Sequence, residues 1–315
     1  MLTVTQADAH KMAAALLLSL FTGASISRRA FSRCATTATA AAAISSVVPP
    51  VVSITAPPPS SLTDADGAYI VDAKRAAAGL EDPLIETEGA YSTISAALAV
   101  APSGAKVIVR PGLYMERLTI TRPVSLLADP GAVVNWKSDK PYEAALTIDL
   151  SDQDEKDAGT TCLVSGLTIR HYSKSIAQNY CVFVPAPSRP ASRFSKVEIR
   201  GCDISSESGS GVGVEGGDVS LAMSKIASCK NHGVLFLGKA SRGSMRECLV
   251  EKNGLSGVLL RDGASPVISS NRFLSNGQYG AALFDCNGRL AEDNTFKGNS
   301  KGAVQGECDD EAEQG

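Results

Sequence analysis

Two aspartates, Asp262 and Asp285, are the side chains whose spacing could best support joint chemistry. Each follows a repeated glycine, Gly257 or Gly280, at the same interval, so their carboxylates should stack on neighbouring turns of a repeat, about 5 Å apart. Such a pair is a candidate binding site, because it could hold calcium or shift the pKa of one member. Both residues also lie in sequences typical of turns, and we favour the turn. We therefore predict no cofactor, with calcium at this pair as the alternative.

The cysteines do not indicate a metal site. Eight are present, with no Cys-x-x-Cys pair and no Cys/His cluster at zinc-ligand spacing. Seven of them follow the repeat described next, rather than a disulfide pattern. This spacing favours small buried thiols on stacked strands over metal or redox chemistry.

The elements that must position these residues are repeats of 22 to 24 residues in the second half of the chain. A period of this size is typical of a solenoid, whose units bury their apolar faces only by stacking on their neighbours. Three columns recur at this period: glycines (Gly211, Gly233, Gly257, Gly280, Gly302), apolar residues (Ile204, Ile226, Leu249, Phe273, Phe296) and asparagines (Asn231, Asn253, Asn276, Asn299).

The asparagine column predicts a ladder at a tight corner. Asparagine tolerates left-handed backbone, and amides stacked from coil to coil can hydrogen-bond to one another. The strands after the glycines, such as residues 258–260, are continuously apolar, which is typical of parallel strands in a narrow tube. The sequence thus predicts an all-β fold, a single-stranded right-handed parallel β-helix of about eight coils.

A short helix and an opening coil precede the repeats. Residues 91–101 place Ile94, Ala97 and Leu98 behind a Ser/Thr N-cap, which predicts a helix that caps the strand edges of the first coil. Three β-like runs follow, at residues 106–109, 117–120 and 124–127.

This opening resembles that of the pectin-lyase-like superfamily. The resemblance is carried by residues 91–94 and 110–127, with a Gly-x-Tyr-x-Glu core at Gly112, Tyr114 and Glu116. The chain is similar in particular to the right-handed β-helix repeat branch, which includes carbohydrate-active enzymes, carbohydrate-binding proteins and the β-helix of F-box-linked proteins. The resemblance covers about residues 90–306 and implies the fold, with the three core residues in architectural roles.

The catalytic sets of enzymes in that superfamily are incomplete in this chain. His232 precedes Gly233 as in polygalacturonases, but their companion aspartates are not seen. Arg189 and Arg193 do not match the spacing of the pectate lyase arginine segment, and the Gln and Asp blocks of pectin methylesterases are missing. We therefore predict no catalytic residue and a non-catalytic repeat protein that binds a carbohydrate or a protein partner along the solenoid face. The alternatives are a divergent polysaccharide lyase or C5-epimerase, and F-box-like substrate recognition in ubiquitination.

The N-terminal residues have the composition of a targeting segment. An apolar run at residues 12–24 follows Lys11, and Arg28-Arg29 resembles a twin-arginine motif. This order resembles an algal plastid presequence and predicts a plastid protein, in the thylakoid lumen, with secretion as the alternative. We predict a presequence and Pro-rich linker at residues 1–63, a linker or partly helical segment at 64–89, the β-helix at 90–306 and an acidic tail at 307–315.

Charge and hydropathy argue against two kinds of partner, nucleic acid and a membrane. A net charge of −3 and a pI near 5.7 provide no basic stripe for nucleic acid. No segment after the N-terminal region has the ~18 apolar residues needed to span a bilayer. We expect a soluble, monomeric mature protein.

Overall fold

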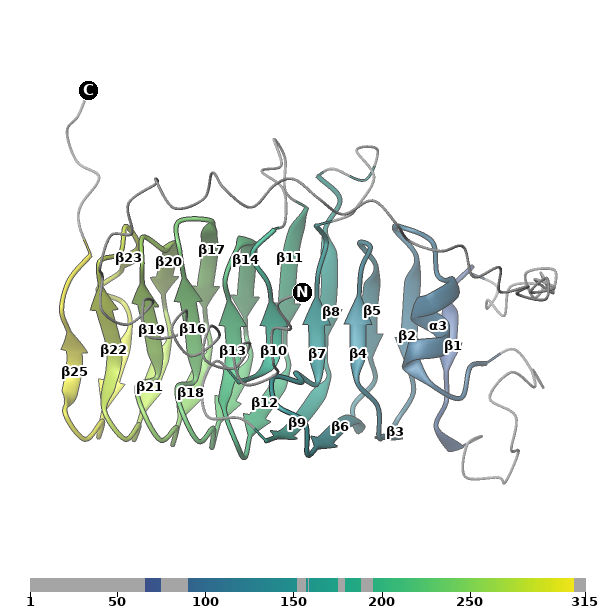
Figure 1. Cartoon of the computed structure of the whole chain (residues 1–315), viewed down its shortest axis with the longest axis horizontal. Helices are drawn as coiled ribbons and strands as arrows, with labels where there is room; N and C mark the ends of the chain where they lie inside the picture. Colours follow the sequence, from purple (N-terminus) through teal and green to yellow (C-terminus); the bar gives the residue numbers. More distant parts are fainter. Residues whose placement is uncertain are drawn as a thin grey trace, which may run out of the picture. The chain divides into compact units, whose positions relative to one another are not determined.

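The computed structural model describes residues 66–74, 90–151, 157, 159–174, 179–187 and 195–308, all within one compact unit, Ala56–Gly315. The described chain winds repeatedly through three parallel sheets, called A, B and C below (Figure 1). The predicted presequence and the acidic residues after Cys308 lie outside the described residues.

Each sheet is a stack of short strands whose spatial order follows the axis of the solenoid. Sheet A contains β1 (Tyr69–Val71), β2 (Lys106–Val109), β5 (Ser125–Ala128), β8 (Cys162–Ser165), β11 (Lys196–Arg200), β14 (Gly217–Ala222), β17 (Ser241–Arg246), β20 (Ser265–Ser269) and β23 (Arg289–Leu290). Sheet B contains β3 (Gly112–Tyr114), β6 (Ala132–Ser138), β9 (Thr168–Ser173), β12 (Asp203–Ser206), β15 (Lys225–Ala227), β18 (Leu249–Glu251), β21 (Arg272–Leu274) and β24 (Thr295–Lys297). Sheet C contains β4 (Leu118–Ile120), β7 (Leu146–Ile148), β10 (Tyr180–Val184), β13 (Ser210–Val214), β16 (Val234–Leu237), β19 (Val258–Arg261), β22 (Tyr279–Phe284) and β25 (Gly302–Gln305).

One strand from each sheet makes one coil. The chain passes from β2, β3 and β4 through to β23, β24 and β25, which gives eight coils. This arrangement confirms the predicted all-β parallel β-helix and its coil number.

The core is a narrow tube filled by alternate side chains of every strand. In β16, Val234 and Phe236 are fully buried in the main core, whereas Leu235 between them belongs to a separate apolar cluster on the outer face of sheet C. Aromatic rings enter the tube only in places, as where Phe273 and Phe296 stack with centroids 5.2 Å apart. Val, Ile, Leu and Ala supply most of the rest, because stacked coils leave little room for larger side chains.

The cysteine prediction holds for five residues and fails for two. Cys162, Cys181, Cys202, Cys229 and Cys248 are buried free thiols. The other two, Cys286 and Cys308, form a disulfide. Their separation of 22 residues corresponds to one coil, which brings their Cα atoms to 4.6 Å, within the range that a disulfide requires.

An asparagine ladder lies at the corner between sheets B and C. Asn253 Nδ2 donates to Asn276 Oδ1 over 3.0 Å, and Asn276 Nδ2 donates to Asn299 Oδ1 over 2.9 Å. Asn231 is not a member, so this part of the prediction is wrong. Cys229 holds the next position, because its backbone N–H donates to Asn253 Oδ1.

In each of the other two predicted columns, one residue was assigned wrongly. The apolar column runs through Val250 rather than Leu249, since Ile226 pairs with Val250 and Val250 with Phe273. In the glycine column, Gly211, Gly233, Gly257 and Gly280 are in register, but Gly302 pairs with Tyr279, so Ala303 is the last member.

A second, shorter ladder lies at the corner between sheets A and B. Asn271 Nδ2 donates to Asn294 Oδ1 over 3.0 Å, and Asn271 Oδ1 accepts the backbone N–H of Cys248. One coil further, Ser224 Oγ accepts the backbone N–H of Cys202. This ladder was not predicted from the sequence, although Asn271 and Asn294 each precede a column phenylalanine by two residues.

The predicted capping helix is α3 (Ile94–Val100), which lies at the β1 and β2 end of the solenoid (Figure 1). Thr93 is its N-cap and accepts the N–H of Ala96. Glu116 accepts the N–H groups of Ile94 and Ser95 at 2.7 and 2.9 Å. The glutamate of the Gly-x-Tyr-x-Glu sequence therefore ties the cap to the first coil.

The three corners differ in how strictly their length is kept. From sheet B to sheet C, eight residues separate the inward-facing pairs in five successive coils: Ile204 and Val212, Ile226 and Val234, Val250 and Val258, Phe273 and Ala281, Phe296 and Val304. From sheet C to sheet A the interval varies, as between Val214 and Val219 and between Phe236 and Gly243. The variation in repeat length arises mainly at this corner.

Candidate functional site

The predicted pair, Asp262 and Asp285, stacks in register at the corner after sheet C, because Arg261 and Phe284 pair just before it. Both aspartates have left-handed backbone, with φ of 60° and 45°, which Asp tolerates better than most residues. Asp262 Oδ2 accepts from Arg261 Nε at 2.9 Å, and Asp285 O accepts from the N–H of Gly263. These are the features of a turn.

The same corner does not complete a metal site. Among the described residues, no group of three or more His, Cys, Asp or Glu side chains is placed to hold a metal ion. Calcium usually takes six or more oxygen ligands, of which the two stacked carboxylates are a small part.

Both described histidines make hydrogen bonds between neighbouring segments of the solenoid. His232 Nδ1 accepts the N–H of Ser256 at 3.2 Å, and burial lowers the pKa of His232 to about 4. His171 contacts Ser206 Oγ and Glu143 O, each at 2.8 Å, and burial lowers the pKa of His171 as well. Near neutral pH both imidazoles are uncharged and serve the fold.

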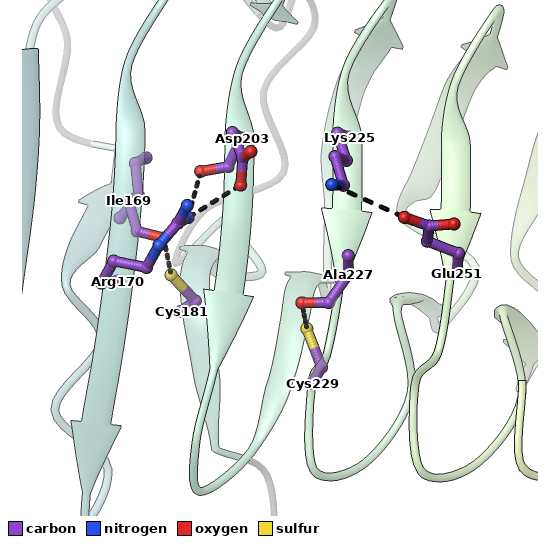
Figure 2. Close-up of polar contacts among 8 residues, drawn as sticks. All are labelled: Ile169, Arg170, Cys181, Asp203, Lys225, Ala227, Cys229 and Glu251. Carbon is purple, nitrogen blue, oxygen red and sulfur yellow. Dashed lines mark hydrogen bonds and ion pairs between the residues drawn. The ribbon is translucent and has the colours of Figure 1, made fainter. Parts of the chain in front are cut away.

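The outer face of sheet B carries charged side chains that were not predicted as a site from the sequence. Arg170 of β9 and Asp203 of β12 form an ion pair, with 2.8 Å between Nη1 and Oδ1. Further along the sheet, Lys225 of β15 lies 3.5 Å from Glu251 of β18, between Nζ and Oε1. Figure 2 shows these two pairs on four successive strands.

A third ion pair flanks an aromatic ring on the same face. Lys137 Nζ of β6 lies 3.2 Å from Glu207 Oε1, which follows β12. The strand between β6 and β12 is β9, and its Tyr172 is the register partner of Lys137. Tyr172 is 38% exposed. We call Tyr172 and the three ion pairs (Lys137–Glu207, Arg170–Asp203 and Lys225–Glu251) the sheet B row.

The sheet B row is extended and electrically balanced. It covers five neighbouring strands, β6 to β18, or about 19 Å at the usual strand spacing. Its three cations are matched by three carboxylates, and the side chains of every pair retain contact with solvent. The row therefore offers donors, acceptors and an aromatic edge without a net charge.

The thiols behind this face are unreactive. Cys181 Sγ lies 3.9 Å from Ile169 O, and Cys229 Sγ lies 3.7 Å from Ala227 O, as Figure 2 shows. Burial raises the pKa of Cys229 to about 12 and that of Cys181 well above its usual range. Neither thiol becomes a thiolate near neutral pH, so the chemistry of this face belongs to its outer side chains.

A one-residue error in the predicted register hid one ion pair of the sheet B row, Lys225–Glu251. The residues on either side of the apolar column point outward, and with Val250 in the column one of them is Glu251. With Leu249 in the column, Glu251 is no longer an outward neighbour. Arg189 and Arg193 lie outside the described residues.

In the part of the chain that the structure describes, no helix has both the length and the apolar character needed to cross a membrane.

Comparison with known protein families supports the fold. The family model described as "Right handed beta helix region" matches residues 156–310. No curated protein matches the chain in sequence. Two crystal structures of the pectin methylesterase from Aspergillus niger, in different deglycosylated forms, are similar to it at 12% and 14% identity, with TM-scores of 0.41 and 0.36. In each case 75% of this chain and 91% of the other are covered.

These two structures provide no residue-by-residue correspondence at such identities. The family match, the three parallel sheets and the eight coils agree with one another. The chain folds as a right-handed parallel β-helix.

Proposed function

We propose that this protein is a non-catalytic binding protein that holds a polysaccharide against the outer face of sheet B. The observation that carries the proposal is the sheet B row, in which Tyr172 and three solvent-accessible ion pairs share one face. An exposed aromatic ring provides an apolar surface for a sugar ring, and paired charges provide donors and acceptors for hydroxyl groups.

The charge balance favours a neutral glycan as the ligand. A polyuronate carries a carboxylate on each unit and would have to compete with Asp203, Glu207 and Glu251 for the cations. Separating an ion pair to bind a second anion gains little at a half-exposed surface. Hydroxyl groups can bond to both partners of a pair without separating them.

The lyase or epimerase alternative requires a base beside the sugar carbon and a cation to neutralise the uronate. In the sheet B row each named cation already faces a carboxylate. A viscosity or reducing-end assay on polyuronates separates this alternative from binding, and we expect no turnover.

The proposal is tested by titrating the folded protein with soluble neutral glucans, mannans and xylans in a calorimeter, with polygalacturonate and alginate as the acidic arm. We expect Tyr172→Ala and Lys225→Ala to weaken binding of the neutral ligand by about tenfold each, equivalent to ~1.4 kcal/mol. Phe284→Ala and Lys196→Ala are matched controls, since Phe284 is an exposed residue of sheet C and Lys196 an exposed residue of sheet A.

Equal losses in the control variants would contradict the location on sheet B. Binding of the acidic polymers alone would contradict the class of ligand. Failure of every glycan to bind would exclude the proposed function and would leave a protein partner as the occupant to seek at the same face.

A further inference from the structure

The two ends of the solenoid are closed differently. At the first coil, α3 buries Ile94, Ala97 and Leu98, and Glu116 fixes the start of the helix. At the last coil, among the described residues, no element packs beyond β23, β24 and β25. Val304, which occupies an inward position of β25, is 39% exposed.

The last coil packs against a neighbour on one side only. Strand β25 is four residues long, and its side chains are largely exposed. The ladder reaches this coil through Asn299, which accepts from Asn276 and donates to Phe273 O. Beyond β25, the covalent attachment is the disulfide from Cys308 to Cys286, which follows β22.

Loss of this coil would uncover apolar surface and a strand edge. Phe273 is fully buried beneath the stacked ring of Phe296, and Ala281 and Leu283 of β22 are 0% and 5% exposed. Without β25, the outer edge of β22 would have unpaired N–H and C=O groups along the four residues from Tyr279 to Ala282. An apolar, unpaired edge of this kind recruits a strand from another chain.

We propose that the Cys286–Cys308 disulfide is a redox-controlled latch of the C-terminal coil, and that its reduction opens a self-association edge on β22 for a second copy of this chain. The reaction is an exchange with a dithiol reductant of the thioredoxin class. A reductant thiolate attacks Cys308, which is the partner partly accessible to solvent, and displaces Cys286 as its thiolate. The second reductant thiol then releases Cys308, the reductant becomes a disulfide, and both protein cysteines end as thiols.

The remaining described cysteines do not compete in this thiol–disulfide exchange. All five are buried, and burial raises the pKa of Cys162, Cys202 and Cys248 to about 11. They therefore provide no competing thiolate for a scrambled pairing. The latch is separate from the sheet B row, so it does not depend on the proposed function.

Hydrogen exchange of the full-length protein, with and without a thioredoxin-class reductant, tests the latch. On reduction, amides of residues 302–305 should exchange faster by on the order of a hundredfold, which is what closing a loop of one coil contributes in the chain-entropy model. Amides of β2 are the internal control and should not change. Light scattering should show the reduced protein becoming dimeric or larger while the oxidised protein stays monomeric.

Cys308→Ser should behave as the reduced protein under both conditions. As a matched variant, Phe284→Lys should keep the latch but hinder pairing of a second chain, because it places a charge at an exposed position of β22 itself. The proposal is overturned if thiol trapping finds Cys286 and Cys308 free in the untreated protein. It is also overturned if the reductant does not reach the disulfide of the folded protein, or if full reduction changes neither the exchange of residues 302–305 nor the molar mass.

Discussion

Cys229 lies directly beside Asn253 on the next coil and donates its backbone N–H to Asn253 Oδ1 over 3.0 Å. The same bond joins Asn253 to Asn276 and Asn276 to Asn299. Cys229 is therefore the last backbone donor to the ladder, and its Sγ lies against Ala227 O of its own coil, where an asparagine amide would bond to the preceding coil. The ladder is a directional series of hydrogen bonds that begins at the open end of the solenoid and stops at Cys229.

The interior of the ladder should be its most sensitive part. Asn276→Ala removes four side-chain hydrogen bonds, to Asn253 N, Asn253 Nδ2, Val250 O and Asn299 Oδ1. We expect a loss of about 3 kcal/mol in the free energy of unfolding, measured by urea titration. Asn287→Ala is the control, because Asn287 is exposed, and it should cost less than about 0.5 kcal/mol. Equal losses would argue against a structural ladder.

The glycine column should reject a methyl group where the coils pack closely. A Cβ at Gly257 would lie 2.7 Å from Gly280 O and from Phe273 Cδ1. We therefore expect Gly257→Ala to destabilise the protein by roughly 1–3 kcal/mol. The matched control is the reverse change at the exposed end of the column, Ala303→Gly, which should cost no more than about 1 kcal/mol. A thermal melt that ranks the two variants the other way would refute the packing argument.

The pKa of His232 should make stability depend on pH. The unfolded imidazole has a pKa near 6.5, and burial lowers the folded value to about 4. Above about pH 6.5 the His232 imidazole is neutral in both the folded and the unfolded protein, so it does not reduce the free energy of unfolding. Between pH 6.5 and 4 only the unfolded state gains the proton, so stability falls as the pH falls, by roughly 2–3 kcal/mol from this group.

His232→Asn should remove that part of the pH dependence, because asparagine can accept the Ser256 N–H without titrating in this range. The measurement is the midpoint of urea unfolding at pH 7 and pH 4.5 for both proteins. His171 titrates in both proteins, so its contribution cancels in the comparison. An unchanged pH difference in the variant would show that His232 is not the group responsible.

Asp262 and Asp285 should respond to substitution as turn residues. Because Asp262 has a φ of 60°, Asp262→Gly should be nearly neutral, whereas Asp262→Val should cost about 1–3 kcal/mol. Calcium at millimolar concentration should leave the Tm of the parent protein unchanged. A calcium-dependent rise in Tm that is lost in Asp285→Asn would instead restore the pair as a binding site.

The repeat, the fold and the cap were accessible from the sequence, because period and alternation are local properties. The register was accessible only to within one or two residues. Asn231 and Gly302 resemble ladder and glycine positions in type, but pairing places Cys229 and Ala303 there. Residue type alone cannot show which of two neighbours points inward when a corner gains a residue.

The same limit explains why the Lys225–Glu251 pair of the candidate site could not be predicted from the sequence. Lys225 and Glu251 are far apart along the chain and meet only through a register that the sequence left ambiguous. The Cys286–Cys308 disulfide is a different case, since a spacing that equals one coil is shared by residues that merely stack. Whether two stacked thiols bond depends on the direction of their Cβ atoms, which the sequence does not contain.

The corners of the solenoid differ in whether their length is fixed. An interval of eight positions, as from Ile204 to Val212, recurs at the corner from sheet B to sheet C as far as Phe296 and Val304. The Asn253–Asn299 ladder lies at this corner. The corner from sheet C to sheet A, as at residues 237–241, changes length without disturbing either neighbour. This corner should therefore accept inserted or grafted loops while every coil keeps its place in the stack.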